Sequence, residues 1–195
     1  NADKNLAGKS ISILLADDVE TAKMTMPSKA GNVCITSDEG KGPYKITVDA
    51  DTVTFPTDVL IESVNITTKS SKGLTISAAK NLAVSKLTSA DLNAIKGTAK
   101  GILEIWENIT PCDITGFGEM RVSDDLDCGT INVGKLIIDD CKLNIKNADS
   151  SVTVKDIEGN DDAAIVYDKN TKPVTVTGKA TGSIVVTTEN ADGFT

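Results

Sequence analysis

The side chains best suited to chemistry include a group of oxygen ligands near the C-terminal end. Asp156, Glu158 and Asn160 stand at alternate positions, and Asp162 follows them. Ca²⁺ takes about six to eight oxygen ligands, and an EF-hand loop begins with such side chains at positions 1, 3 and 5. The loop then requires Gly and a final Glu, where this chain has Asp and Tyr. The pattern therefore favours solvated turns, with a calcium site at these four residues as the alternative.

A second possible chemistry is glycoside cleavage, which needs two carboxylates beside a bound sugar. Carboxylates are abundant, for example in the pairs Asp17-Asp18, Asp124-Asp125 and Asp139-Asp140. Sugar rings often stack on aromatic side chains, and Trp106 is the one tryptophan. It alternates out of phase with Leu103 and Ile105, so we expect it to face outward, either as a ligand contact or as the cover of a corner. A uronate lyase would need basic groups, and Arg121 is the one arginine.

The four cysteines offer two interpretations. Cys112, Cys128 and Cys141 alternate in phase with apolar neighbours, which is typical of small buried hydrophobic residues. The alternative is a disulfide among these three. Cys34 lies far from them in the sequence, and no Cys-x-x-Cys motif is present.

The charge and the missing residue types exclude several function classes. The chain has 195 residues, 20 basic against 28 acidic side chains, a net charge of -8 and no histidine. Triads and metal sites that depend on imidazole are therefore excluded. An acidic chain with 3% aromatic residues also lacks the charge and the stacking groups for nucleic acid. No apolar run is long enough for a transmembrane helix.

The elements that must position these side chains are short strands. Apolar-x-apolar units rich in Val, Ile and Thr recur at intervals of about ten residues from Ile46 to Ile184. Two inward residues followed by a polar break predict a single-stranded, right-handed parallel β-solenoid, with a β-sandwich as the alternative. With about 20–30 residues per coil, residues 45–190 make roughly five to seven coils.

The regularity also predicts the domain organisation. We expect an N-terminal leader and cap over residues 1–43 and the β-solenoid domain over residues 44–195, because the first segment is less regular. Residues 89–95 fit either one helical turn, with Ser89 as its N-cap, or one more coil. Three segments resemble one another, 71–76, 96–105 and 177–186, and each has Gly just before a strand.

The short Thr/Val/Ile strands, the acidic and Gly-containing corners and the polar first residues are similar to those of bacterial cell-surface β-solenoid proteins. These include anchored lipoproteins and adhesin head domains. The resemblance covers residues 45–190, is architectural and carries no catalytic residue over. It implies an extracellular or cell-surface location, with a lipid anchor on a removed N-terminal segment as one possibility.

These observations lead to three hypotheses about function. The first is a non-catalytic surface or secreted module that binds a glycan or a host or partner protein. The second is a carbohydrate-active β-helix enzyme, a glycosidase or lyase. The third is a structural component that pairs through an end or edge of the solenoid. No cofactor is expected other than the calcium ion considered above.

Overall fold

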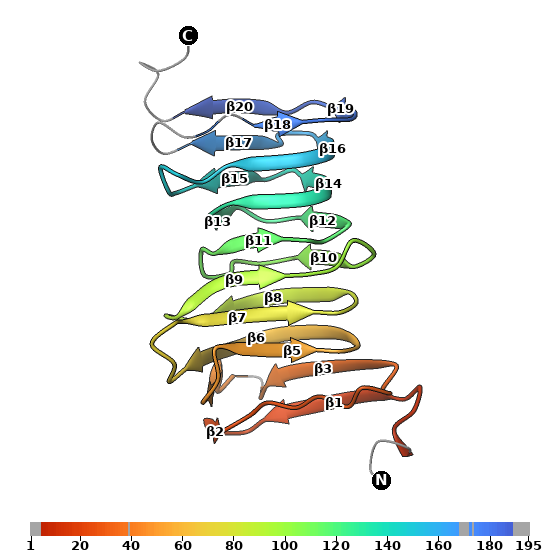
Figure 1. Cartoon of the computed structure of the whole chain (residues 1–195), viewed down its shortest axis with the longest axis vertical. Helices are drawn as coiled ribbons and strands as arrows, with labels where there is room; N and C mark the ends of the chain where they lie inside the picture. Colours follow the sequence, from red (N-terminus) through yellow and green to blue (C-terminus); the bar gives the residue numbers. More distant parts are fainter. Residues whose placement is uncertain (1–4, 39, 168–171, 173, 189–195) are drawn as a thin grey trace.

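The chain forms a rod of stacked parallel strands (Figure 1). The structure, a computed structural model, describes residues 5–38, 40–167, 172 and 174–188, and every element that it names there is a β-strand. All strand pairs are parallel. The predicted all-β solenoid is confirmed, with about eight coils. The β-sandwich alternative is wrong, because sandwich hairpins pair strands in antiparallel fashion.

Each coil passes through three faces, which we call A, B and C in chain order. Face A contains β1 (Ser10–Leu15), β3 (Asn32–Ser37), β8 (Leu82–Thr88), β10 (Ile102–Ile105), β12 (Glu119–Val122) and β19 (Ala180–Gly182). Face B contains β2 (Val19–Thr21), β4 (Tyr44–Val48), β13 (Leu126–Cys128), β15 (Lys142–Ile145), β17 (Ala164–Tyr167) and β20 (Val185–Thr188). Face C contains β5 (Thr52–Phe55), β7 (Leu74–Ala78), β9 (Leu92–Lys96), β11 (Asp113–Thr115) and β18 (Thr175–Val176).

Three longer strands bend around corners and link these faces. β6 (Asp58–Thr68) passes from face A to face B, because its first half pairs with β3 and its second half with β4. β14 (Ile131–Asp139) and β16 (Val152–Asn160) pass from face C to face A. The end of β8 likewise turns beyond face A and pairs with the second half of β6.

The coils vary in length. Glu119 pairs with Lys135 and Val19 with Ile46, so a coil takes between 16 and 27 residues. The shortest coils are tighter than the predicted range of about 20–30 residues. Glycine permits this close stacking: a Cβ on Gly134 would lie 2.4 Å from the carbonyl oxygen of Gly118 in the coil below.

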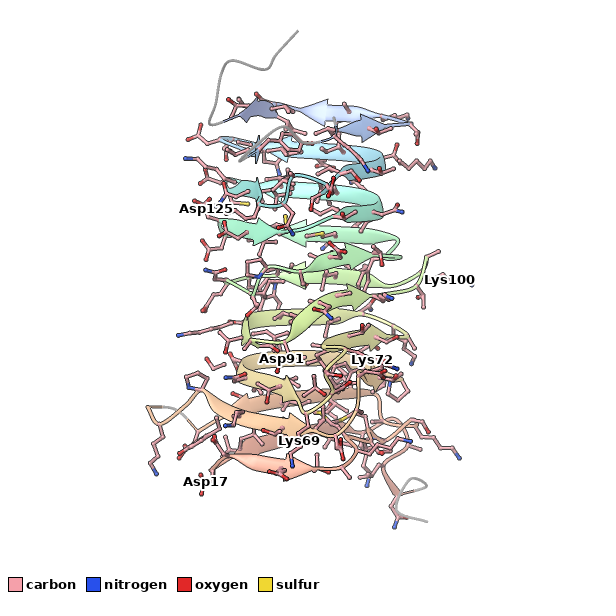
Figure 2. The ribbon with its side chains drawn as sticks, turned by 60° about the vertical axis from the view of Figure 1, so that its left-hand side comes forward. Asp17, Lys69, Lys72, Asp91, Lys100 and Asp125 are labelled. Carbon is pink, nitrogen blue, oxygen red and sulfur yellow. The ribbon has the colours of Figure 1, made fainter. Side chains whose placement is uncertain are left out.

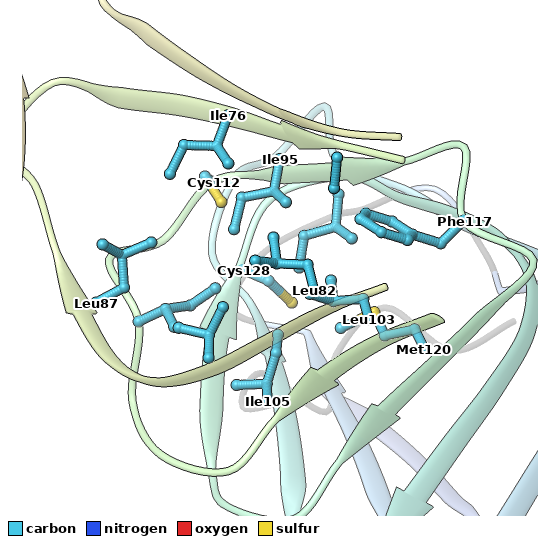
Figure 3. Packing of buried hydrophobic residues seen from close by; sticks show 14 of the residues in the cluster. Ile76, Leu82, Leu87, Ile95, Leu103, Ile105, Cys112, Phe117, Met120 and Cys128 are labelled. Atoms are coloured by element: carbon cyan, nitrogen blue, oxygen red, sulfur yellow. The ribbon is translucent and has the colours of Figure 1, made fainter. Parts of the chain in front are cut away.

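The inward side chains stack into continuous apolar rows. On face A, Leu82, Leu103 and Met120 lie opposite one another on successive strands, and each is essentially inaccessible to solvent (Figure 3). Burial of one such side chain stabilises the fold by about 1.5–3 kcal/mol. The core is therefore aliphatic, and Phe55 and Phe117 are its fully buried phenylalanines.

Acidic residues at the corners hold the backbone of the next coil. The Oδ1 atoms of Asp18, Asp125 and Asp156 accept hydrogen bonds from the backbone N–H groups of Lys45, Lys142 and Lys179, each at 2.8 Å. Charged side chains project from the sides of the rod along its length (Figure 2). The acidic pairs of the sequence thus include carboxylates that satisfy backbone donors where the strands end.

Parallel stacking already occurs within the segment expected to be the N-terminal leader and cap, because β1, β2 and β3 pair in register with the coils that follow. The division of the chain at residues 43 and 44 stays a prediction. Gly40, Gly42 and Pro43 interrupt the apolar-x-apolar spacing before residue 44, so the spacing alone does not indicate that the earlier strands belong to the stack. Residues 89–95 form no helical turn: they lead into β9, which agrees with one more coil.

Candidate binding face

Face A carries a groove over its N-terminal half, which we call the face-A groove. It is a hollow of about 460 Å³ that spans the strands β1, β3, β6, β8 and β10. Ser12, Cys34, Leu60 and Ala83 follow one another across this face, each paired with the next. Because inward residues alternate with outward ones, this row projects away from the core.

The lining of the groove combines an apolar floor with a polar rim. Cys34, Leu60, Ala83 and Ile102 provide outward apolar surface. Its polar side chains come from Ser10, Ser12, Asn32, Asp58, Asn81 and Glu104. The lining contains no lysine, arginine or aromatic side chain. It therefore favours a neutral or cationic ligand with some apolar surface over a polyanion.

Hydrogen bonds between coils fix part of this rim. The carboxylate Oδ1 of Asp58 accepts the backbone N–H of Asn81 at 3.1 Å. The side-chain oxygen of Asn81 in turn accepts the backbone N–H of Ile102 at 2.9 Å. This ladder spans three successive coils, so the rim is held in place before any ligand arrives.

Cys34 contributes a neutral thiol to the floor. Desolvation, followed by the nearby charge of Glu62, raises the pKa of Cys34 above its ordinary value. The thiolate is the nucleophilic form of cysteine, and a raised pKa keeps the thiol protonated near neutral pH. The groove therefore presents Cys34 as a contact surface and as a position that a thiol reagent can modify.

The C-terminal half of face A carries a ladder of opposite charges. The guanidinium of Arg121 lies 3.3 Å from Glu104 and 2.5 Å from Glu119. Farther along the face, Lys135 Nζ of β14 lies 2.6 Å from Glu158 of the adjacent strand β16. Hydrogen bonds to Glu119 and Glu158, respectively, raise the pKa values of Arg121 and Lys135. Face A is thus divided into an apolar hollow and a region of paired charges.

Trp106 lies at the edge of face A, directly after β10. It is 44% exposed, and its backbone N–H donates to the carbonyl of Val84 at 2.9 Å. The expected outward orientation is confirmed. Trp106 is not part of the groove lining, although Glu104 on the preceding strand β10 is. Whether it contacts a ligand stays a prediction.

The predicted calcium ligands spread along one strand. Asp156, Glu158 and Asn160 alternate along β16, so their Cα atoms are roughly 6.6 Å apart. Asp156 accepts the Lys179 N–H, Glu158 pairs with Lys135, and the Asn160 amide donates to Asp139 at 3.2 Å. Asp162 lies beyond the strand in a turn. In the described part of the chain no three acidic or cysteine side chains form a metal-binding group.

The structure does not bring Trp106 and this acidic set together, because β12 and β14 lie between β10 and β16. A calcium site stays a prediction, and calorimetry with Ca²⁺ that shows neither heat nor a higher melting temperature would remove it.

The cysteines are free thiols in this structure. Cys112, Cys128 and Cys141 are buried, as expected of small hydrophobic residues, and no disulfide joins them. Desolvation raises the pKa of Cys112 to about 12 and that of Cys141 to about 11, and it raises the pKa of Cys128 as well. These buried, protonated thiols are poor nucleophiles.

Comparisons with protein families, with curated proteins and with solved structures find no match for this chain. No helix in the described residues is both long and apolar enough to cross a membrane.

The groove and the charge ladder are the features that sequence reasoning missed. Their residues come from strands that lie 16 to 26 positions apart, and this offset changes from coil to coil. Alternation within each strand indicates that Leu60 or Arg121 faces outward, but only the register between coils places it beside its neighbours.

Proposed function

We propose that this chain is a non-catalytic binding and adhesion module that acts at the cell surface or in the secreted fraction and holds its ligand in the face-A groove. The observation that carries the proposal is the hollow of about 460 Å³ with a preorganised rim and an apolar floor. The protonated thiol of Cys34 and the absence of cationic groups from the lining favour binding over nucleophilic or lyase chemistry.

The lining favours a segment of a partner protein as the ligand. Leu60, Ala83 and Ile102 can accept apolar side chains, and the rim can accept or donate hydrogen bonds. Acidic polysaccharides fit less well, because the lining carries the carboxylates of Asp58 and Glu104 and no basic side chain, and the one arginine beside Glu104 is already shared with Glu119. A neutral glycan remains the second ligand class within this proposal.

The extracellular part of the proposal rests on the architectural resemblance. Three of the four cysteines are buried with raised pKa values and react slowly with oxidants, so these three are compatible with an oxidising compartment. A lipid anchor on a preceding segment belongs to the same proposal. Protease treatment of intact cells tests it: a surface protein is digested, whereas protection of the protein would contradict this location.

A panel of immobilised ligands tests the binding role. It contains neutral polysaccharides, uronate-bearing polysaccharides and surface proteins, and it is read both for retention and for the release of new reducing or unsaturated ends. Retention without product is expected. Ala83→Trp, which fills the groove, should abolish retention, whereas Ile137→Trp, in the same outward row among the paired charges, should not. Equal retention by both variants would exclude the groove.

A second candidate, a carbohydrate-active enzyme, is favoured by the exposed Trp106 at the edge of a face that carries two carboxylates. Glu104 lies two residues before Trp106 and Glu119 lies on the next strand, opposite Ile102, but both carboxylates are held by Arg121. The wild-type protein would then release new chain ends from a polysaccharide, and Glu104→Gln or Glu119→Gln would abolish this release. That result would support the enzyme candidate and overturn the non-catalytic proposal.

A further inference from the structure

The two ends of the rod expose strand edges that have a partner on one side only. Within the described residues, β1 pairs only with β3 and β2 only with β4. At the other end, β20 pairs only with β17, and β18 and β19 pair only with β16. Among the described residues, each end therefore offers unpaired backbone donors and acceptors, which can template pairing with another strand.

The apolar rows are also open at both ends. Val19 pairs with the buried Ile46, and Val186 pairs with the buried Ile165, so both valines belong to inward rows of face B. Yet Val19 is 42% exposed and Val186 is 43% exposed. The partly buried side chains that complete the core at the ends are Ile11, Ile13 and Met24 at one end and Val174, Val176 and Ile184 at the other.

These end strands lack the charges that usually protect an exposed edge. Charged residues make up 25% of the chain. In the end strands β1, β2, β18, β19 and β20, Glu20 is the one charged residue. Glu20 is itself paired with Lys69. Lysine or other charges on an edge strand oppose edge-to-edge association, and within these end strands such charges are absent apart from Glu20, whereas Lys9 and Lys179 lie just outside them.

The two ends complement each other. β19 presents the small inward residues Ala180 and Gly182, whereas β1 presents Ile11 and Ile13 at the corresponding positions of face A. Because every pairing in the rod is parallel, a head-to-tail junction continues the parallel direction on faces A and B, where the first coil has the strands β1 and β2. A junction between two like ends, related by a twofold axis across the rod, would reverse the direction of the facing strands.

We propose that the partner of these ends is a second copy of this chain, stacked head to tail so that β1 and β2 of one copy extend the sheets that end in β19 and β20 of another. Such a heterologous contact does not close on itself, so copies add to form open filaments. This inference goes beyond the binding role. The face-A groove reaches the end strand β1, but it is lined mainly from β3, β6, β8 and β10, and the outward side chains of β1 stay on the side of the rod when its edge is paired.

Analytical ultracentrifugation of the intact 195-residue chain over a range of concentrations tests the stacking. The wild-type average mass should rise steadily with concentration, without a plateau at the dimer. Val19→Lys disables one end and Val186→Lys disables the other, so each variant alone should remain monomeric. An equimolar mixture should form a heterodimer and nothing larger, because it contains one intact end of each kind. Ile137→Lys, on the side of the rod, should associate like the wild type.

Three outcomes would overturn the proposal: a wild-type chain that stays monomeric at every concentration, self-association of either end variant alone, or a mixture that contains monomers only. Self-association of Val19→Lys would indicate a junction between two C-terminal ends instead. Both valines are already partly exposed, so the variants should fold, and far-UV circular dichroism identical to that of the wild type establishes that they do.

Discussion

Single carboxylates at the corners carry structural roles that their exposure does not reveal. The Oδ1 of Asp125 accepts the Lys142 N–H of the next coil, whereas Asp124 accepts the N–H of its own neighbour, Asp125. The first hydrogen bond joins two coils and the second is local. Acidic residues that look like solvated turns in the sequence can therefore differ in their contribution to stability.

We predict that Asp125→Ala lowers the free energy of unfolding by about 0.5–1 kcal/mol, because a backbone donor at the start of β15 loses its acceptor. Urea denaturation measures the change. The matched control Asp124→Ala should cost less, since its hydrogen bond does not cross between coils. Equal losses for the two variants would contradict a role for Asp125 in joining coils.

The buried thiols predict a loss of stability in alkali. Burial raises the pKa of Cys112 to about 12 and that of Cys141 to about 11, above the ordinary value of 9.0. Above pH 9 the unfolded chain loses thiol protons that the folded chain keeps, so the free energy of unfolding falls as pH rises through about 11. The stabilisation from these groups is fully present below pH 9.

Urea denaturation at a series of pH values between 9 and 11 measures this slope. Lysine ion pairs weaken over the same range, so the comparison that isolates the thiols is with the double variant Cys112→Ala and Cys141→Ala. Its stability should depend less steeply on pH than that of the wild type. An identical slope would show that these thiols do not contribute.

At the scale of the strand, alternation decides which side chains support the core. Ile137 and Ile138 are adjacent on β14, yet Ile138 is fully buried and Ile137 lies in the outward row between Arg121 and Glu158. Ile138→Ala should lower the free energy of unfolding by about 2–5 kcal/mol, and Ile137→Ala by less than about 1 kcal/mol. Urea denaturation of both variants checks the assignment, and a larger loss for Ile137→Ala would reverse it.

Much of this alternation could be predicted from the sequence, because it is a local property. The inward Ile105, the outward Trp106 and the buried Cys141 all follow from period-two patterns. The relation between coils could not be predicted, because the coil length changes and no local signal records it. The similar segments 71–76, 96–105 and 177–186 end on faces C, A and B respectively. They repeat a corner and a strand rather than a whole coil.

The variable length of the coils also limits what could be predicted about the site. The oxygen spacing at Asp156, Glu158 and Asn160 is visible in the sequence, but their partners Lys179, Lys135 and Asp139 come from neighbouring coils. The face-A groove depends on five strands at once and leaves no contiguous motif. Sequence reasoning therefore located outward side chains but not the surface that they form together.

For the molecule as a whole, a stack of coils means that each coil contacts mainly its neighbours. Stability then approximates a sum of coil and junction terms, so the ends can open without unfolding the middle. The side of the rod carries the face-A groove and the paired charges, whereas the two ends carry the unpaired edges. Binding on the side and association at the ends should therefore respond to different substitutions.

Hydrogen exchange should follow this organisation. In dilute solution, backbone amides of β8, β10 and β12, which have paired strands on both sides, should exchange most slowly, and those of β1 and β20 fastest. If copies stack head to tail, protection of β1 and β20 should increase with protein concentration while that of β10 stays constant, because association stabilises only the strands at the junction. Mass-spectrometric exchange at low and high concentration measures both effects. In Val186→Lys the increase should vanish at both ends, since each junction requires one end of each kind.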